Sequence, residues 1–168
     1  MTDLNAALAH YRAHDDQYLE DLKAMCRIPS VSFSGFDPAH LAHSARVTRE
    51  LLLARGFDRA EILELEGAHP YVLAEADATT ADAPTVLGYA HHDVQPSGPE
   101  EEWTSPPFQP EVRNERLYCR GSGDDKAGIA VHLAAVDAWK AAGGLPVNVK
   151  FLIEGEEEVG SATLDRFL

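Results

Sequence analysis

The chain of 168 residues carries 28 acidic and 14 basic side chains, a formal net charge of −14, and 45% of its residues are hydrophobic. Length and apolar content allow one domain with a sizeable core but not two ordinary domains. The acidic balance argues against nucleic acid or an anionic membrane surface as a partner. Two cysteines, Cys26 and Cys119, match no zinc-ribbon or redox spacing, so we expect buried free thiols in a reducing compartment.

Apolar runs of the kind needed for secretion or membrane insertion are missing. Residues 1–16 contain no apolar segment of signal-peptide length, and no run elsewhere is long enough to span a bilayer. We therefore expect a cytoplasmic protein without a membrane partner.

The first half of the chain predicts two helices and three strands. Apolar spacing predicts one long core-packing helix over residues 3–28, ended by Pro29. A second helix begins at the Asp37-Pro38 pair and stops at Gly56, a left-handed C-terminal cap. The residues expected to face the core are Leu4, Leu8, Tyr11, Tyr18, Leu22 and Met25 in the first helix, and Leu41, Ala45, Thr48 and Leu52 in the second. The strands are expected at residues 60–65, 71–76 and 85–93.

The second half begins with a proline-rich loop. It predicts a strand near residues 116–121, a third helix over residues 125–144 and a last strand over residues 147–153. Strands that alternate with helices predict an α/β sandwich with a mixed, partly parallel sheet. In such sheets ligands gather outside the carboxyl ends of the strands. Three unusual polar clusters are expected at that edge.

The first cluster is the sequence AHHD at residues 90–93. In an extended segment, His91 and Asp93 point to the same side and His92 points to the other. A histidine that binds a metal usually donates its other ring N–H to a carboxylate, and Asp93 is placed for that role. Two alternatives are a solvated His-Asp pair at a strand end and a phosphohydrolase-type site at His92-Asp93. The second is disfavoured because that motif belongs on a helix.

The second cluster is RGSGDDKAG at residues 120–128, where glycines precede a helix. It fits no phosphate-binding loop, because the Walker pattern needs Gly-Lys-Ser/Thr and the dinucleotide pattern needs glycine in place of Lys126. Asp124 and Asp125 would also repel a phosphate. Two interpretations stay open: one of these carboxylates caps the helix, or the glycines aim one of them inward as a metal bridge.

The third cluster is EGEEE at residues 154–158, directly after the apolar run FLI. Carboxylates this close repel one another unless water solvates them or a cation lies among them. A solvated acidic first turn of a helix is one interpretation. The preceding apolar run favours the rim of a sheet, where one glutamate can bind a metal and its neighbour can reach an activated water.

In this order and spacing, the motifs resemble the co-catalytic zinc peptidase family of carboxypeptidase G, cytosolic dipeptidases, acetylornithine deacetylase, succinyl-diaminopimelate desuccinylase and aminoacylase. The dipeptidases are the most similar branch. The motifs that carry the resemblance are HHDVQP, Trp103, a following Pro-Phe pair, LYCRGSGDDKAG and EGEEEVGS. Cys119 where glycine is frequent, Ala127 where glycine is usual, and His92 depart from the pattern without removing a ligand.

The resemblance implies a zinc-exopeptidase-like three-layer sandwich, incomplete in this chain, and a site for two divalent metal ions, zinc with manganese or cobalt as alternatives. His91 would bind one ion, Asp124 would bridge both, and Glu158 would bind the second. Glu157 would be the general base, and Asp93 would orient His91. It also implies a cis peptide bond at Asp124-Asp125 and hydrolysis of a peptide or amide bond in a small peptide or acylated amino acid.

Members of the family are longer than this chain. By similarity, residues 1–168 would be the N-terminal part of a metallopeptidase catalytic domain, without its C-terminal part and without the domain that forms a homodimer in the full-length protein. The chain is then expected to be inactive alone. The alternatives are a non-catalytic binding or regulatory module that keeps the fold, and a metal-independent acidic domain in which all three clusters are caps and solvated rims.

Overall fold

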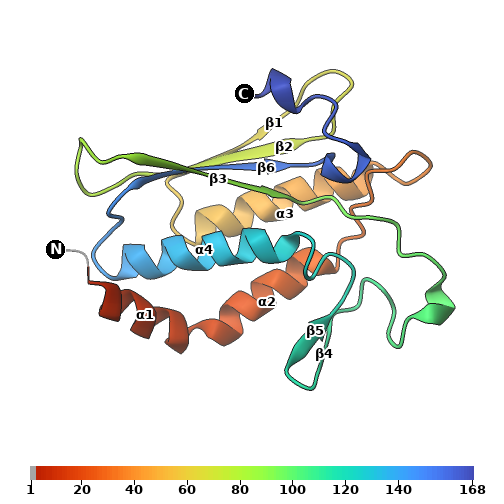
Figure 1. Cartoon of the computed structure of the whole chain (residues 1–168), viewed down its shortest axis with the longest axis horizontal. Helices are drawn as coiled ribbons and strands as arrows, with labels where there is room; N and C mark the ends of the chain where they lie inside the picture. The colour runs from red at the N-terminus through yellow and green to blue at the C-terminus, as the bar shows by residue number, and fades with distance from the viewer. Residues whose placement is uncertain (1–2) are drawn as a thin grey trace.

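The computed structural model describes residues 3–168, in which one mixed sheet is covered by helices (Figure 1). The main sheet has the order β1-β2-β6-β3. β1 pairs with β2 and β2 with β6 in antiparallel fashion, while β3 and β6 are parallel. Its strands are β1 Arg59–Leu63, β2 Tyr71–Ala76, β3 Thr85–His91 and β6 Asn148–Glu154. The prediction of an α/β fold with a mixed, partly parallel sheet is confirmed.

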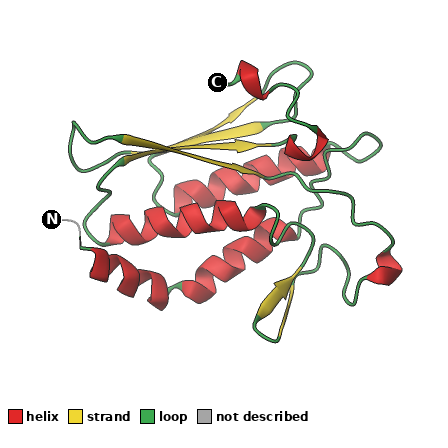
Figure 2. Ribbon diagram, viewed as in Figure 1, coloured by secondary structure: helices red, strands yellow, loops and turns green. Residues whose placement is uncertain are grey.

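The helices form two tiers on one side of the sheet (Figure 2). α3 Ala39–Ala54 and α4 Lys126–Ala141 lie against the strands, and α1 Leu4–Ala13 and α2 Asp15–Cys26 pack on α4 from the far side. The core lies between the sheet and the first tier, where Leu52, Ile129, Phe151 and Ile153 are fully buried. Burial of such side chains contributes about 1.5–3 kcal/mol each.

The second predicted helix forms as expected. Its four predicted core residues, Leu41, Ala45, Thr48 and Leu52, are all buried. Asp37 Oδ1 accepts the backbone N–H of Ala39 at 2.9 Å, which caps the helix start. Gly56 has φ +89°, the left-handed conformation that ends a helix and that glycine adopts without strain.

The prediction of a single long helix over residues 3–28 is wrong, because the helix is interrupted at His14. The ring Nδ1 of His14 lies 2.8 Å from the carbonyl oxygen of His10, which a continuous helix would leave for the backbone N–H of His14. That N–H instead donates to the carbonyl of Tyr11 at 3.1 Å, and His14 has φ −126° and ψ 14°. A local contact between side chain and backbone therefore competes with the helix.

Three of the predicted core positions are consequently exposed. Leu4, Leu8 and Tyr11 on α1 retain 57%, 41% and 45% of their accessible surface, whereas Met25 on α2 retains 1%. Leu4, Leu8 and Tyr11 line an apolar groove of about 520 Å³ between α1, α2 and α4. The helical spacing of the apolar residues was predicted correctly, but the break at His14 turns this face of α1 away from the core.

The strand predicted near residues 116–121 lies outside the main sheet. β5 Arg116–Tyr118 pairs with β4 Glu111–Arg113, a strand that sequence did not predict, in a separate two-stranded hairpin. Three short 3-10 helices complete the elements: η1 Glu100–Glu102, η2 Glu157–Val159 and η3 Leu164–Arg166. Both cysteines are buried free thiols, as predicted. None of the helices in residues 3–168 combines the length and apolar character needed to cross a bilayer.

Candidate metal centre

The three polar clusters meet at one edge of the sheet. β3 and β6 run in parallel with His91 directly opposite Glu154, so the segments after both strands leave the sheet side by side. Glu157 and Glu158 lie in the turn just past β6, and Asp124 lies in the loop that leads into α4. Parallel pairing therefore places residues from distant parts of the chain around one point.

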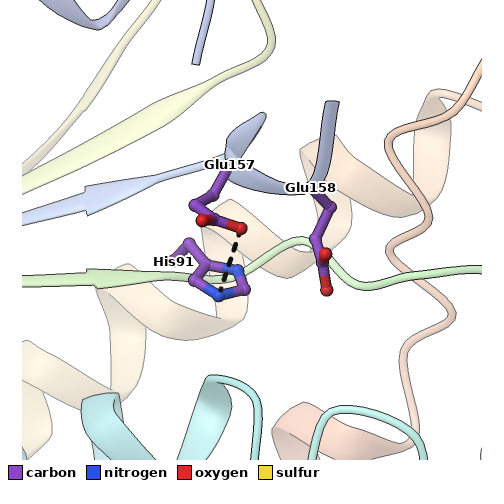
Figure 3. Close-up of side chains that lie close together, drawn as sticks. All are labelled: His91, Glu157 and Glu158. Atoms are coloured by element: carbon purple, nitrogen blue, oxygen red, sulfur yellow. Dashed lines mark ion pairs between the residues drawn. The ribbon is translucent and has the colours of Figure 1, made fainter. Parts of the chain in front are cut away.

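His91, Glu157 and Glu158 offer ligand atoms that all lie within 4.8 Å of one another (Figure 3). The Nε2 atom of His91 is 3.8 Å from Glu157 Oε2 and 3.0 Å from Asp124 Oδ1. Within residues 3–168, Asp124 is not part of the three-residue group, and its side chain is 81% exposed. The structure thus brings four of the predicted site residues together, and Asp124 joins the group through its contact with His91.

Asp93 lies beneath this group and is fully buried. Nδ1 of His91 lies 3.1 Å from the backbone carbonyl oxygen of Asp93 and 3.3 Å from its Oδ1 atom, and Asp93 Oδ2 accepts the hydroxyl of Ser32 at 2.6 Å. The same carboxylate accepts the backbone N–H groups of Glu157 at 3.3 Å and Glu158 at 3.1 Å. Asp93 therefore ties the histidine and the acidic turn to one anchor.

The charges in this group shift its titration. Burial alone would lower the pKa of His91, but Asp93, Asp124 and Glu157 raise it to about 9. Burial would raise the pKa of Asp93, yet hydrogen bonds from His91, Ser32 and the turn hold it below its usual range. Burial raises the pKa of Glu157, opposed by His91 and supported by the neighbouring carboxylates. The imidazole of His91 therefore lies among carboxylates that favour its protonated form.

His92 points to the opposite side, as the strand alternation predicts. Its Nε2 atom is 2.9 Å from the carbonyl oxygen of Pro70, and burial lowers the pKa of this ring to about 4. Gly155 lies against it, since an added Cβ there would come within 2.9 Å of His92 Nε2. His92 is thus a neutral core residue, which leaves no phosphohydrolase-type pair with Asp93.

Two of the four crowded glutamates do not face the candidate site. Glu154 is fully buried and accepts the hydroxyls of Tyr71 at 3.0 Å and Tyr89 at 2.6 Å. Glu156 accepts the Thr163 hydroxyl at 2.6 Å and the backbone N–H of His69 at 3.1 Å. Hydrogen bonds account for these two carboxylates, so the interpretation of the run as a cation site stays a prediction for Glu157 and Glu158 alone.

The contacts of the loop before α4 argue against a phosphate site and against a helix cap by Asp125. The Nζ atom of Lys126 is fully buried and donates to the carbonyl oxygens of Met25 at 2.9 Å and Ile28 at 3.0 Å, so it is not free to hold a phosphate. Asp125 is at the N-cap position but makes no capping hydrogen bond. Its Oδ2 atom instead accepts the backbone N–H of His91 at 3.3 Å. The Asp124-Asp125 peptide bond is cis, as the resemblance implied.

Sequence reasoning missed Gln95. Its Nε2 atom donates to Glu158 Oε2 at 2.7 Å, and its backbone N–H donates to Glu158 Oε1 at 3.1 Å. The signal was present, because His91, Asp93 and Gln95 follow one another at steps of two and so share one face of an extended segment. The alternation was read only as far as Asp93.

The donor set fits a divalent metal ion. One imidazole and several carboxylates are ligands that zinc uses in catalytic sites. The second ring nitrogen of His91 is held by the backbone carbonyl and the carboxylate of Asp93, which is usual for a histidine that binds zinc. The close approach of Glu157 and Glu158 to one another is unfavourable by itself, and either a protonated His91 or a bound cation offsets it. The structure groups His91, Glu157 and Glu158 as residues that could hold a metal, and Asp124, which the resemblance adds to the ligands, meets this group through His91.

Comparison with known proteins agrees with this geometry. Residues 87–166 match the model of Peptidase family M20/M25/M40. A Beta-Ala-His dipeptidase from Mus musculus is 37% identical over 100 residues, which are 59% of this chain and 20% of that protein. A succinyl-diaminopimelate desuccinylase from Dechloromonas aromatica is 44% identical over 77 residues, which are 45% of this chain and 20% of that protein.

A solved structure shares the fold throughout. Human carnosine dipeptidase 1 superposes with a TM-score of 0.87 at 30% identity, over 98% of this chain and 37% of that chain. This chain therefore spans only a part of the relatives that it matches. The resemblance predicted from the motifs is confirmed, because residues 87–166 match Peptidase family M20/M25/M40 and the relatives and the solved structure point the same way.

Proposed function

We propose that this chain contributes part of the catalytic centre of a metal-dependent hydrolase, which cleaves a peptide or amide bond in a small peptide or an N-acyl-amino acid. The main support is the buried carboxylate of Asp93, which joins His91 to the turn of Glu157 and Glu158. The names of the relatives, a Beta-Ala-His dipeptidase and a succinyl-diaminopimelate desuccinylase, favour substrates of this class.

In this proposal His91 and Glu158 would each hold one divalent ion, and Asp124 would be the ligand that the two ions share. Zinc is the preferred ion, with manganese or cobalt as alternatives. When bound, the ions supply the positive charge that polarises the scissile carbonyl and acidifies the attacking water. Asp93 keeps the imidazole of His91 oriented with Nε2 toward the site, because Nδ1 lies 3.1 Å from its backbone carbonyl oxygen and 3.3 Å from its carboxylate.

Glu157 is the proposed general base. Its carboxylate is 43% exposed and faces Nε2 of His91, so it can reach a water molecule in the same space. Burial raises its pKa, which makes the carboxylate a better proton acceptor and its acid form able to return the proton. Glu157 would take the proton of the attacking water and deliver it to the departing amine.

The remaining proposals concern the whole protein. We place residues 1–168 in the N-terminal part of a metallopeptidase catalytic domain, with further ligands and a dimerisation domain supplied by sequence that the longer relatives contain. The full-length protein would be a cytoplasmic homodimer, and this chain alone would be inactive because its half of the ligand set holds metal weakly.

The test joins this chain to the C-terminal region of a dipeptidase relative and measures dipeptide hydrolysis with zinc. Glu157→Gln should lower kcat by about 10²–10⁴-fold, because it removes a general base. Glu101→Gln, an exposed glutamate in η1, is the matched control and should leave kcat unchanged. Equal rates for Glu157→Gln and the unmodified protein would refute the assigned base. Zinc binding without any hydrolysis would favour a non-catalytic binding module.

A further inference from the structure

Gln95 holds both carboxylate oxygens of a residue 63 positions away. Its backbone N–H donates to Glu158 Oε1 at 3.1 Å, and its side-chain Nε2 donates to Oε2 at 2.7 Å. The same Nε2 lies 3.5 Å from the backbone carbonyl oxygen of Glu158. One neutral residue therefore fixes both the position and the rotation of this carboxylate.

The backbone around Gln95 is itself held in place. Val94 is fully buried, forms a parallel bridge with Val31 and donates its N–H to the carbonyl of Ser30 at 3.0 Å. Pro96 follows and restricts Gln95 to extended conformations. A donor next to a buried bridge residue is held in one position, so it can orient its partner without the entropy cost of ordering a loop.

The neighbouring glutamate has no such support. Within residues 3–168, the carboxylate of Glu157 accepts no hydrogen bond and has only His91 as an ion-pair partner, at 3.8 Å. Two N–H groups hold the carboxylate of Glu158, whereas no hydrogen bond restricts the side-chain rotation of Glu157 within the described residues. A ligand must stay in place and a proton carrier must move, so the two adjacent glutamates are suited to different tasks.

We propose that Gln95 is the positioning residue for Glu158, and that the affinity of this site for a divalent metal ion depends on its side-chain amide. The inference rests on the proposed function. The amide adds no charge, so Glu158 keeps its full negative charge for the ion. Each oxygen accepts one of the two N–H groups and keeps a lone pair for the metal.

A merely structural strap is the alternative role for Gln95. The acidic turn is already anchored, however, because Asp93 accepts the backbone N–H groups of Glu157 and Glu158. Gln95→Leu removes the amide, keeps the backbone N–H donor to Glu158 and leaves this anchor in place. The variant therefore separates aiming of the carboxylate from anchoring of the turn.

The experiment is a calorimetric titration with Zn²⁺ alone of this chain joined to the C-terminal region of a dipeptidase relative, in the unmodified form and as Gln95→Leu, Gln95→Glu and Gln109→Leu. Gln109 is an exposed glutamine of the same loop and serves as the control. Gln95→Leu should weaken zinc binding by about 10–100-fold, the usual loss when a residue behind a metal ligand is removed. Gln95→Glu keeps the size but opposes Glu158 with a carboxylate, and should weaken binding at least as much. Gln109→Leu should bind as the unmodified chain does.

Melting temperatures of the metal-free proteins complete the test. Unchanged zinc affinity in both Gln95 variants overturns the inference and leaves the proposed function standing. A lowered melting temperature with unchanged zinc affinity also overturns it, because this is the signature of a strap. Absence of zinc binding by the unmodified joined protein overturns the proposed function, whereas zinc binding that both Gln95 variants retain in full overturns the inference alone.

Discussion

The carboxylate of Asp93 lies 3.3 Å from Nδ1 of His91 and is completely buried at the junction of three segments. It receives hydrogen bonds from the hydroxyl of Ser32 and from the backbone of the acidic turn after β6. Buried charges persist only when they are paired and hydrogen-bonded, and this one is satisfied on both oxygens. Asp93 therefore contributes both to the stability of this edge of the sheet and to the arrangement of the candidate site.

Replacing Asp93 with asparagine should lower both the stability of the protein and the zinc affinity of the site. The amide removes the charge and turns an N–H₂ group toward N–H donors, so we expect a loss of about 1–3 kcal/mol in the free energy of unfolding. Zinc affinity should fall about 10–100-fold. Chemical denaturation and zinc titration measure the two effects, with the exposed Asp82→Asn as control. An Asp93→Asn variant as stable as the control would contradict the anchoring role.

Gly155 should tolerate no side chain. An added Cβ would collide with the backbone carbonyl oxygen of Pro70 and come within 2.9 Å of His92 Nε2. Gly155→Ala should therefore cost about 1–3 kcal/mol of stability, the usual range for overpacking. Gly123→Ala is the control, because a Cβ at Gly123 meets nothing within 4 Å. Equal midpoints of urea unfolding for the two variants would show that the turn can shift to make room.

Tyr18 should make the stability sensitive to alkaline pH. Burial and the 2.7 Å hydrogen bond from its hydroxyl to Asp137 raise the pKa of Tyr18 above its ordinary value of 10.0. The folded state thus holds the proton more tightly than the unfolded state. The stabilisation is complete below pH 10 and is lost as the pH rises further.

Tyr18→Phe should remove this part of the pH dependence. Urea unfolding at about pH 8 and about pH 11 should show a smaller loss of stability for Tyr18→Phe than for the unmodified chain. Tyr118→Phe, on the exposed hairpin, is the control and should keep the full loss. Parallel losses in all three proteins would mean that Tyr18 does not carry the effect.

The outer edge of β3 should promote self-association. Among the strands that the structure describes, β3 pairs with β6 alone, and Val86, Leu87 and Tyr89 are 51%, 61% and 45% exposed. Apolar residues on an unpaired edge favour pairing with another chain. Leu87→Lys should shift the chain toward monomer in sedimentation velocity, and Val112→Lys on the separate hairpin should not. A chain that is monomeric at all concentrations would refute the prediction.

Sequence pattern was most informative where burial follows a regular period. The second helix, the strands of the main sheet and α4 were all predicted, because their apolar faces match the buried face of one packed element. The break at His14 was missed since it depends on a ring contact with the carbonyl of His10, which has no periodic signature. Propensity alone cannot foresee such local competition.

The candidate site shows the same division. Alternation along the strand placed His91 and Asp93 on one side and His92 on the other, as the structure has them. The partners of Glu154 and Glu156 come from β2, β3 and residues 69 and 163, so only the folded chain could separate these glutamates from the pair that faces His91.

The central claim is that His91 and the acidic turn hold one metal centre, and zinc K-edge X-ray absorption of the zinc-loaded chain tests it most directly. The account predicts a first shell that includes one imidazole nitrogen and carboxylate oxygens at about 2.0–2.2 Å. The imidazole signal should vanish in His91→Ala and persist in His43→Ala, an exposed histidine of α3. A spectrum without imidazole in the unmodified chain, or one that His91→Ala leaves unchanged, would contradict the account.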